Sequence, residues 1–351
     1  MLLLSTAALL ILSSWVLGRL PDFPPQQLIP IFLLGMMLIS LRGLERSRVL
    51  SWGAARLEGG RSPLSKLVGI SLFLSTFLGI DATLLTLLPL VIGMKLNHRI
   101  LAGVLVALSA HVGAALTPVG TPQNLFIFHR YSPGIGEFIL LMVPFALGFS
   151  FLYLSIAQIY DKKSPPLDPS PPLHSFRPRP ARIYGALFLL SVAAALHLLP
   201  WWSSGIVVGY GVWRDREALR IDYSLLATFV LFVGLAENIS QLIPGSLLRT
   251  EHTFLLAAAL SQGISNVPAT LLLQHFTPHW QALLWGVNAG GFGTPVASMA
   301  NLITLRIFAK SVSGREYRRF RRLFLLGNIL SLLAALILYR IFWGLLHGNG
   351  G

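Results

Sequence analysis

The sequence predicts an all-α membrane protein made of two inverted repeats, and three observations support this. Hydrophobic residues make up 54% of the 351 residues and charged residues only 11%, whereas a soluble domain carries about 25% charged residues. Mean hydropathy is +0.70, and apolar stretches of about 20 residues, long enough to cross a bilayer, recur along the chain. The third observation is a proline-containing motif that occurs twice.

The repeated motif reads Thr-Pro-Val-Gly-Thr-Pro-Gln-Asn-Leu at 117–125 and Thr-Pro-Val-Ala-Ser-Met-Ala-Asn-Leu at 294–302. The offset is 177 residues (294 − 117 = 177), close to half of the chain. Each copy interrupts an apolar segment that otherwise favours helix. Lipid tolerates broken backbone only where protein or a watery cavity surrounds it. Matching breaks in two halves therefore indicate the binding site of a transporter.

The apolar blocks can be placed in order along the chain. The first half contains blocks 2–18, 27–43, 64–93, 98–129 and 136–160. A Pro- and Ser-rich stretch, 161–181, forms a cytoplasmic linker, and the second half contains 182–200, the short 202–213, 222–239, 252–277, 279–309 and 322–346. Blocks 64–93 and 252–277 have the wrong length for one or two simple spans. Each fits a re-entrant helix–tip–helix hairpin, which leaves about nine crossings plus two hairpins.

The domain prediction follows from these blocks. The first repeat is 1–160, with scaffold helices in 2–43 and transport elements in 64–129. The second repeat is 182–351, with scaffold helices in 182–239 and transport elements in 252–309.

The net charge of +14 reflects membrane topology rather than nucleic-acid binding. Lys and Arg cluster in short loops after 27–43, in the linker, after 202–213 and after 279–309, as the positive-inside rule requires. All four clusters share one side if the hairpins do not cross and 202–213 does. The N-terminus is then cytoplasmic, in a bacterial inner membrane, and the halves are inverted because five crossing steps, an odd number, relate them. The absence of cysteine excludes disulfides and thiolate metal sites.

Asp81 is the most informative ionisable residue. Of the thirteen acidic residues it alone lies deep in an apolar block, at the centre of 64–93. A carboxylate there is costly unless it is protonated or meets a cation or a cavity. We interpret Asp81 as a coupling-ion or proton site; the alternative is a helix N-cap.

The remaining candidates are hydroxyl and amide groups at the second hairpin tip and at the two breaks. Their oxygen atoms suit a desolvated Na⁺, and the helix starts that follow suit an anion; the alternatives are plain N-caps and proline kinks. The predicted site consists of Asp81, Thr83, Thr117, Gly120, Thr121, Gln123, Asn124, Ser265, Asn266, Thr294, Ser298 and Asn301. A Na⁺ ion would be held by Asp81, Asn124, Asn266 and Asn301. His111 reads as a buried histidine, with a proton relay as the alternative.

Several motifs together resemble the ion transporter superfamily, which includes divalent anion/sodium symporters, citrate transporters, arsenite permeases and one class of sodium/proton antiporters. They are Asp81-Ala-Thr-Leu-Leu-Thr-Leu-Leu-Pro-Leu, both break motifs, Asp222-Tyr-Ser-Leu-Leu, Ser265-Asn-Val-Pro and Gly-Gly-Phe-Gly before Thr294. The resemblance implies a scaffold domain, and a transport domain that moves like an elevator. The symporters carry Ser-Asn-Thr at each tip. Here the second tip is Ser265-Asn266-Val267 and the first is Gly79-Ile80-Asp81, which is more similar to the arsenite-permease and antiporter branches.

We therefore expect a secondary active transporter that moves a small anion, coupled to Na⁺ or H⁺, with no cofactor beyond the coupling ion. The alternative is a sodium/proton antiporter or arsenite efflux permease that uses Asp81. An intramembrane enzyme is disfavoured because only one deep carboxylate exists, and a channel is disfavoured by the paired hairpins. The expected partners are the lipid bilayer, a small anion or cation substrate and a second copy in a homodimer. Substrate, coupling ion and direction of transport stay open.

Overall fold

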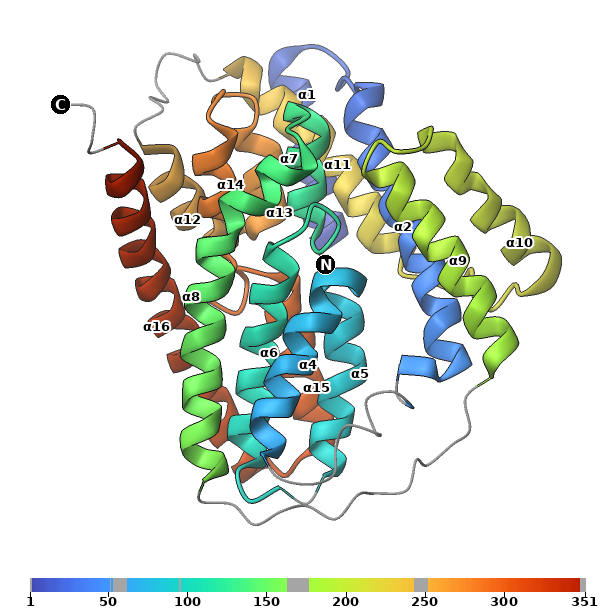
Figure 1. Ribbon diagram of the computed structural model, residues 1–351. Helices are drawn as coiled ribbons and strands as arrows, with labels where there is room; N and C mark the ends of the chain where they lie inside the picture. The colour runs from blue at the N-terminus through green and yellow to red at the C-terminus, as the bar shows by residue number, and fades with distance from the viewer. Residues whose placement is uncertain are drawn as a thin grey trace.

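The computed structural model describes residues 2–50, 52, 62–94, 96–162, 177–242 and 252–347. Every regular element in these ranges is a helix, as predicted, and no strand occurs among them (Figure 1). The helices of the first half are α1 (Leu2–Leu17), α2 (Pro25–Ser47), α4 (Pro63–Leu78), α5 (Ile80–Gly93), α6 (Arg99–Ala115), α7 (Pro122–Tyr131) and α8 (Ile135–Asp161). Most of the predicted linker, residues 163–176, lies outside the described ranges.

The second half continues with a similar succession of helices. They are α9 (Pro178–Ala195), the 3₁₀ helix η1 (Trp201–Gly205), α10 (Ile206–Arg214), α11 (Tyr223–Leu242), α12 (Thr253–Ile264), α13 (Asn266–Leu273), α14 (Trp280–Gly290), α15 (Met299–Ser311) and α16 (Gly314–His347). Four helices of the described chain, α2, α8, α11 and α16, are long and apolar enough to cross a membrane. The other five predicted crossings consist of shorter, interrupted or less apolar helices, so the total of nine stays a prediction.

The two blocks of unusual length each fold into two helices joined at one residue. Gly79 separates α4 from α5 with φ +83° and ψ 167°, and Ser265 separates α12 from α13 with φ +74° and ψ 153°. A positive φ with an extended ψ reverses the chain without a loop. Glycine adopts this conformation readily, whereas Ser265 is held in it by the surrounding structure.

Both repeated motifs interrupt a helix where they were expected to. The first break separates α6 from α7 between Ala115 and Pro122, and the second separates α14 from α15 between Gly290 and Met299. Pro122 occupies the first turn of α7, where an amide hydrogen would have no helical partner. The breaks are therefore compatible with helix on both sides.

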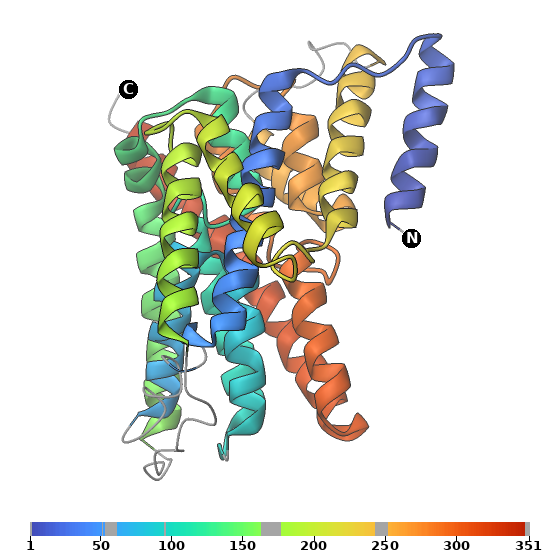
Figure 2. The same ribbon diagram turned by 90° about the vertical axis from the view of Figure 1, so that its right-hand side faces the viewer.

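The helices pack around separate hydrophobic cores. The largest core joins α4, α5, α6, α7 and α8 to α12, α13, α14, α15 and α16. A second core joins α2, α9 and α10 and includes Leu125 of α7. A third, smaller one joins α2 and α11 to residues of α7 and α13. Figure 2 shows α9, α2 and α11 across the upper part of the view, with α5 and α15 extending below them.

Helix α1 lies at the edge of the molecule beside α11 (Figure 2). Asn238 of α11 is fully buried and donates from Nδ2 to the hydroxyls of Ser13 (3.0 Å) and Ser14 (2.9 Å). Hydrogen bonds of this kind join helices where lipid provides no hydrophobic driving force between them. The opposite face of α1 is exposed, including Trp15 at 80%.

Candidate functional site

Each hairpin tip is fastened to one helix break. The backbone N–H of Ile80 donates to the carbonyl of Gly120 at 3.2 Å, and the N–H of Asn266 donates to the carbonyl of Ala297 at 3.0 Å. Gly120 and Ala297 are separated by the same 177 positions (297 − 120) as the repeated motif. The first tip–break contact is thus reproduced in the second half.

The asparagine of each motif holds its own break together. Asn124 donates from Nδ2 to the carbonyls of Ala115 (3.1 Å) and Thr117 (3.0 Å). Asn301 donates to the carbonyls of Gly291 (3.0 Å) and Thr294 (3.1 Å). Each side chain replaces backbone donors that the interrupted helix lacks.

The hydroxyls that open the two motifs also have internal partners. Thr117 Oγ1 donates to the carbonyl of Thr76 at 2.8 Å, and Thr294 Oγ1 donates to that of Gln262 at 2.8 Å. Both acceptors belong to the hairpin arm that precedes a tip. The hairpins and breaks therefore form one hydrogen-bonded unit in each half.

A cavity of about 80 Å³ lies where the tips and breaks converge. The starts of four helices line it: Ile80 of α5, Pro122 of α7, Asn266 of α13 and Met299 of α15. Each start carries backbone N–H groups without intrahelical partners and the positive end of a helix dipole. Four such ends together favour negative charge in the cavity. The opposite wall is a largely apolar face of α11, with Leu225, Phe229, Phe232 and Thr228, whose hydroxyl donates to the carbonyl of Ser224.

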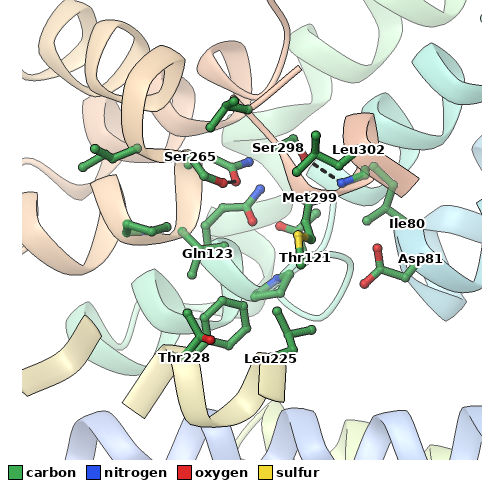
Figure 3. A pocket seen from close by; sticks show the side chains of 18 of the residues that line it. Ile80, Asp81, Thr121, Gln123, Leu225, Thr228, Ser265, Ser298, Met299 and Leu302 are labelled. Carbon is green, nitrogen blue, oxygen red and sulfur yellow. Dashed lines mark hydrogen bonds between the residues drawn. The ribbon is translucent and has the colours of Figure 1, made fainter. Parts of the chain in front are cut away.

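Two buried polar atoms that line the cavity have no hydrogen-bond partner in the described chain. They are Oγ1 of Thr121 and Nε2 of Gln123, whose residues are 5% and 2% exposed. In Figure 3 these two side chains lie between Ser265 on one side and Leu225 and Thr228 on the other. Unpaired buried polar groups are costly. A polar ligand would satisfy both atoms.

Two ionisable side chains line the cavity, Asp81 and His111. Asp81 is in the first turn of α5 and lies to one side of the cavity, beyond Met299 (Figure 3). His111 of α6 is 4% exposed, and its Nε2 lies 2.9 Å from the carbonyl of Asn288. A carbonyl only accepts, so Nε2 carries the hydrogen. The lining contains no Lys or Arg.

Comparison with known proteins decides the family. The model of the family described as Citrate transporter matches residues 2–287, which is most of the chain. This protein belongs to the citrate transporter family. The match confirms the resemblance to the ion transporter superfamily, and the protein is accordingly an integral membrane transporter.

Individual members of the family are also similar to this chain. An uncharacterized transporter of Methanocaldococcus jannaschii is 30% identical over 337 residues, which cover 89% of each chain. An inner membrane protein of Escherichia coli is 32% identical over 246 residues, covering 67% of this chain and 66% of that protein. An uncharacterized transporter of Mycobacterium tuberculosis is 25% identical over 380 residues, covering 90% of this chain and 87% of that protein.

In this member of the citrate transporter family, half of the predicted site residues line the cavity and the other half do not. Those lining it are Asp81, Thr121, Gln123, Ser265, Asn266 and Ser298. Those outside the lining are Thr83, Thr117, Gly120, Thr294, Asn124 and Asn301. The residues outside the lining take part in hydrogen bonds with the backbone instead. For example, Thr83 Oγ1 donates to the carbonyl of Gly79 at 2.9 Å.

The sequence prediction missed two residues that hydrogen-bond to the breaks, Asn288 and Gln262. Asn288 donates from Nδ2 to Oδ1 of Asn124 at 2.8 Å, and Gln262 donates from Nε2 to the carbonyls of Gly290 (2.8 Å) and Phe292 (3.1 Å). The sequence contained one signal for Asn288. It lies 177 positions after His111, which is the spacing of the two motifs, so the two residues occupy equivalent positions in the two halves. Gln262 has no comparable signal, since its role depends on how the hairpin packs.

Proposed function

We propose that this transporter moves a small anion through the cavity, coupled to Na⁺ or H⁺. The observation that carries the proposal is the convergence of four helix starts on one cavity. Partial positive charge from the ends of four helix dipoles favours an anion there. An anion held in this way needs no basic side chain, and none lines the cavity.

The cavity's polar groups support an oxyanion or carboxylate as substrate. Nε2 of Gln123 is an unpaired donor, and the Thr121 hydroxyl can donate or accept. Ser265 and Asn266 at the second tip supply further hydroxyl and amide groups. The apolar residues of α11 limit the substrate's size on the far side, which favours a compact ligand.

Asp81 is the proposed coupling-ion site, because it is the only carboxylate in the lining. It can bind Na⁺ together with oxygen ligands from the break, or it can bind a proton. The same observation favours a second candidate function, a sodium/proton antiporter or arsenite efflux permease in which Asp81 is the exchanged site. His111 is a second titratable group in the lining and a candidate for proton coupling.

The repeats are proposed to be inverted, with α4–α5 and α12–α13 as re-entrant hairpins. The longest of these arms, α4, has 16 residues and is about 24 Å long at 1.5 Å per residue. A hydrocarbon core is about 30 Å thick, and the two arms of each hairpin meet at a tip, where Ile80 or Ser265 lines the cavity inside the protein. Each hairpin would then enter and leave by the same face.

An elevator mechanism is proposed from the division of the hydrophobic cores. The core of α4, α5, α6, α7, α8, α12, α13, α14, α15 and α16 would move as the transport domain. The helices α2, α9 and α10 of the second core would stay fixed as the scaffold, and Leu125 of α7 and Leu78 of α4, which pack against that core, would slide along it. The small core between α2, α11, α7 and α13 would be the sliding surface. We also propose that the protein forms a homodimer in a bacterial inner membrane, with its N-terminus in the cytoplasm.

A thermal-shift screen of anions tests this function. Purified protein is heated with carboxylates and oxyanions, each with and without Na⁺ and at two pH values. A bound ligand stabilises by mass action, by about 2.7 kcal/mol at 100 times its dissociation constant. At least one anion should raise the melting temperature in an ion-dependent way. Gln123→Ala should remove that shift, whereas Ser109→Ala, which removes a buried unpaired hydroxyl outside the cavity, should keep it. Stabilisation by Na⁺ alone, with no anion effect, would favour the antiporter.

A further inference from the structure

A second cavity lies at the far end of the transport elements from the hairpin tips. Its volume is about 960 Å³. It is bounded by the α5–α6 connection, by Tyr160 at the end of α8 and by the first turns of α16. Figure 1 shows these three segments at the same end of the molecule. The cavity shares no residue with the one at the tips and breaks.

Arginine dominates the second cavity. Its basic lining residues are His98 and five arginines, Arg99, Arg315, Arg318, Arg319 and Arg322, and its only acidic lining residue is Glu316. Arg99 donates to Oε1 of Glu316 at 2.6 Å, so this carboxylate is already engaged. The four arginines of α16 form no ion pair with any carboxylate of the described chain. They are also exposed, and thus available to an external anion.

The four arginines lie along one stripe of α16 because their spacing follows i, i+3, i+4, i+7. The same stripe continues with apolar residues that are about half exposed: Leu326 (52%), Ile329 (49%), Leu330 (56%) and Leu333 (50%). No charged residue occurs from Leu323 to Tyr339. One continuous face therefore changes from guanidinium groups to hydrocarbon within a helical turn after Arg322.

We infer that this cavity binds the headgroup of an anionic phospholipid, with its acyl chains lying along the apolar continuation of α16. Guanidinium groups form paired hydrogen bonds with phosphate oxygens, and basic pockets beside membrane helices suit anionic headgroups. A soluble phosphate would use the arginines alone. A lipid would also cover the adjacent leucine and isoleucine side chains, and this second contact favours the lipid.

Binding of defined lipids to the purified full-length protein in detergent tests the inference. Dioleoylphosphatidylglycerol is titrated against the wild type and followed by native mass spectrometry and thermal shift, with dioleoylphosphatidylcholine in parallel. The wild type should bind the anionic lipid saturably and more tightly than the zwitterionic one. Each basic residue near an anionic surface contributes about fivefold to affinity, so Arg318→Gln/Arg322→Gln should bind about 30-fold more weakly.

The matched control is Arg214→Gln/Arg216→Gln, which removes two exposed arginines outside the cavity and should leave lipid binding unchanged. If Arg318→Gln/Arg322→Gln proves unstable without lipid, Arg315→Gln/Arg319→Gln is the substitute and should show the same loss. Three results would overturn the inference: equal lipid affinity in the cavity and control variants, equal binding of both lipids, or a full thermal shift from inorganic phosphate alone.

Discussion

Asn288 and Asn124 connect the two halves of the molecule directly. Nδ2 of Asn288, in the helix before the second break, donates to Oδ1 of Asn124, in the helix after the first break, at 2.8 Å. Both residues are fully buried. Asn124 in turn donates to carbonyls of its own break. The two breaks are therefore joined by a hydrogen bond between side chains that have no contact with solvent.

Asn124→Ala should destabilise the protein. The substitution removes the donor to two break carbonyls and leaves Asn288 Nδ2 with only its bond to the Leu284 carbonyl. Leaving a buried polar group unpaired costs about 1–3 kcal/mol. We expect a lower melting temperature in detergent. Asn301→Ala should lower it less, because among the described contacts the Asn301 side chain forms no hydrogen bond to a side chain of the other half. Unchanged melting temperatures for both would show that the breaks hold without the asparagines.

Asp81→Asn should abolish ion coupling while the protein stays folded in the membrane. The amide keeps the size of the carboxyl group but cannot bind a proton or neutralise Na⁺. Ion dependence of ligand-induced stabilisation and the pH dependence of transport are the measurements. Thr86→Ala, elsewhere on α5 and outside the cavity lining, serves as control. If the ion dependence and the pH dependence of Asp81→Asn equal those of the wild type, Asp81 is not the coupling-ion site and only helps to start α5.

Gly291→Ala should damage the site at the second break. A Cβ atom at this position would collide with the ring of His111 and lie 3.1 Å from Nδ2 of Asn266. Overpacking of this kind costs about 1–3 kcal/mol, and it would displace two cavity residues. We expect weaker ligand binding and a lower melting temperature. Gly263→Ala, near the second tip, has open space for the Cβ and should bind ligand normally; if both variants behave alike, close packing at Gly291 is irrelevant.

The topology is tested by cysteine labelling at positions 201 and 216. The chain has no native cysteine to interfere. If η1 and α10 cross the membrane as proposed, Trp201→Cys and Arg216→Cys should react with impermeant reagents from opposite sides of oriented vesicles. The ion pair of Asp215 with Arg46, at the end of α2, agrees with this arrangement. Labelling of both positions from the same side would contradict the inversion of the halves.

The sequence was sufficient to predict the helices, the two tips and the two breaks. Hydropathy locates apolar segments, and Pro118 and Pro122 mark a place where helical hydrogen bonds cannot continue. The repeat then relates Asn124 to Asn301 without any structure. These features are local or depend on spacing alone, so they are visible along a single chain.

The sequence did not predict which polar groups face the cavity. Asn124 and Gln123 are adjacent and chemically alike. The Asn124 amide donates its hydrogen bonds to carbonyls of the break, whereas Gln123 Nε2 has no partner among the described atoms. That difference depends on the exact direction of the helix start. His111 is the buried, hydrogen-bonded histidine that the sequence predicted, but its place in the cavity lining depends on packing against α14 and was not predicted.

Transport into proteoliposomes tests the central claim most directly, namely that the cavity at the tips and breaks is the site of an ion-coupled anion transporter. The probe is the radiolabelled anion that gives the largest ion-dependent thermal shift. The wild type should accumulate it against its gradient when a Na⁺ or pH gradient is imposed, and an ionophore that dissipates the gradient should stop accumulation. Gln123→Ala should lose uptake and Ser109→Ala should retain it. Downhill flux that ignores the ionophore, or full accumulation by Gln123→Ala, would contradict the account.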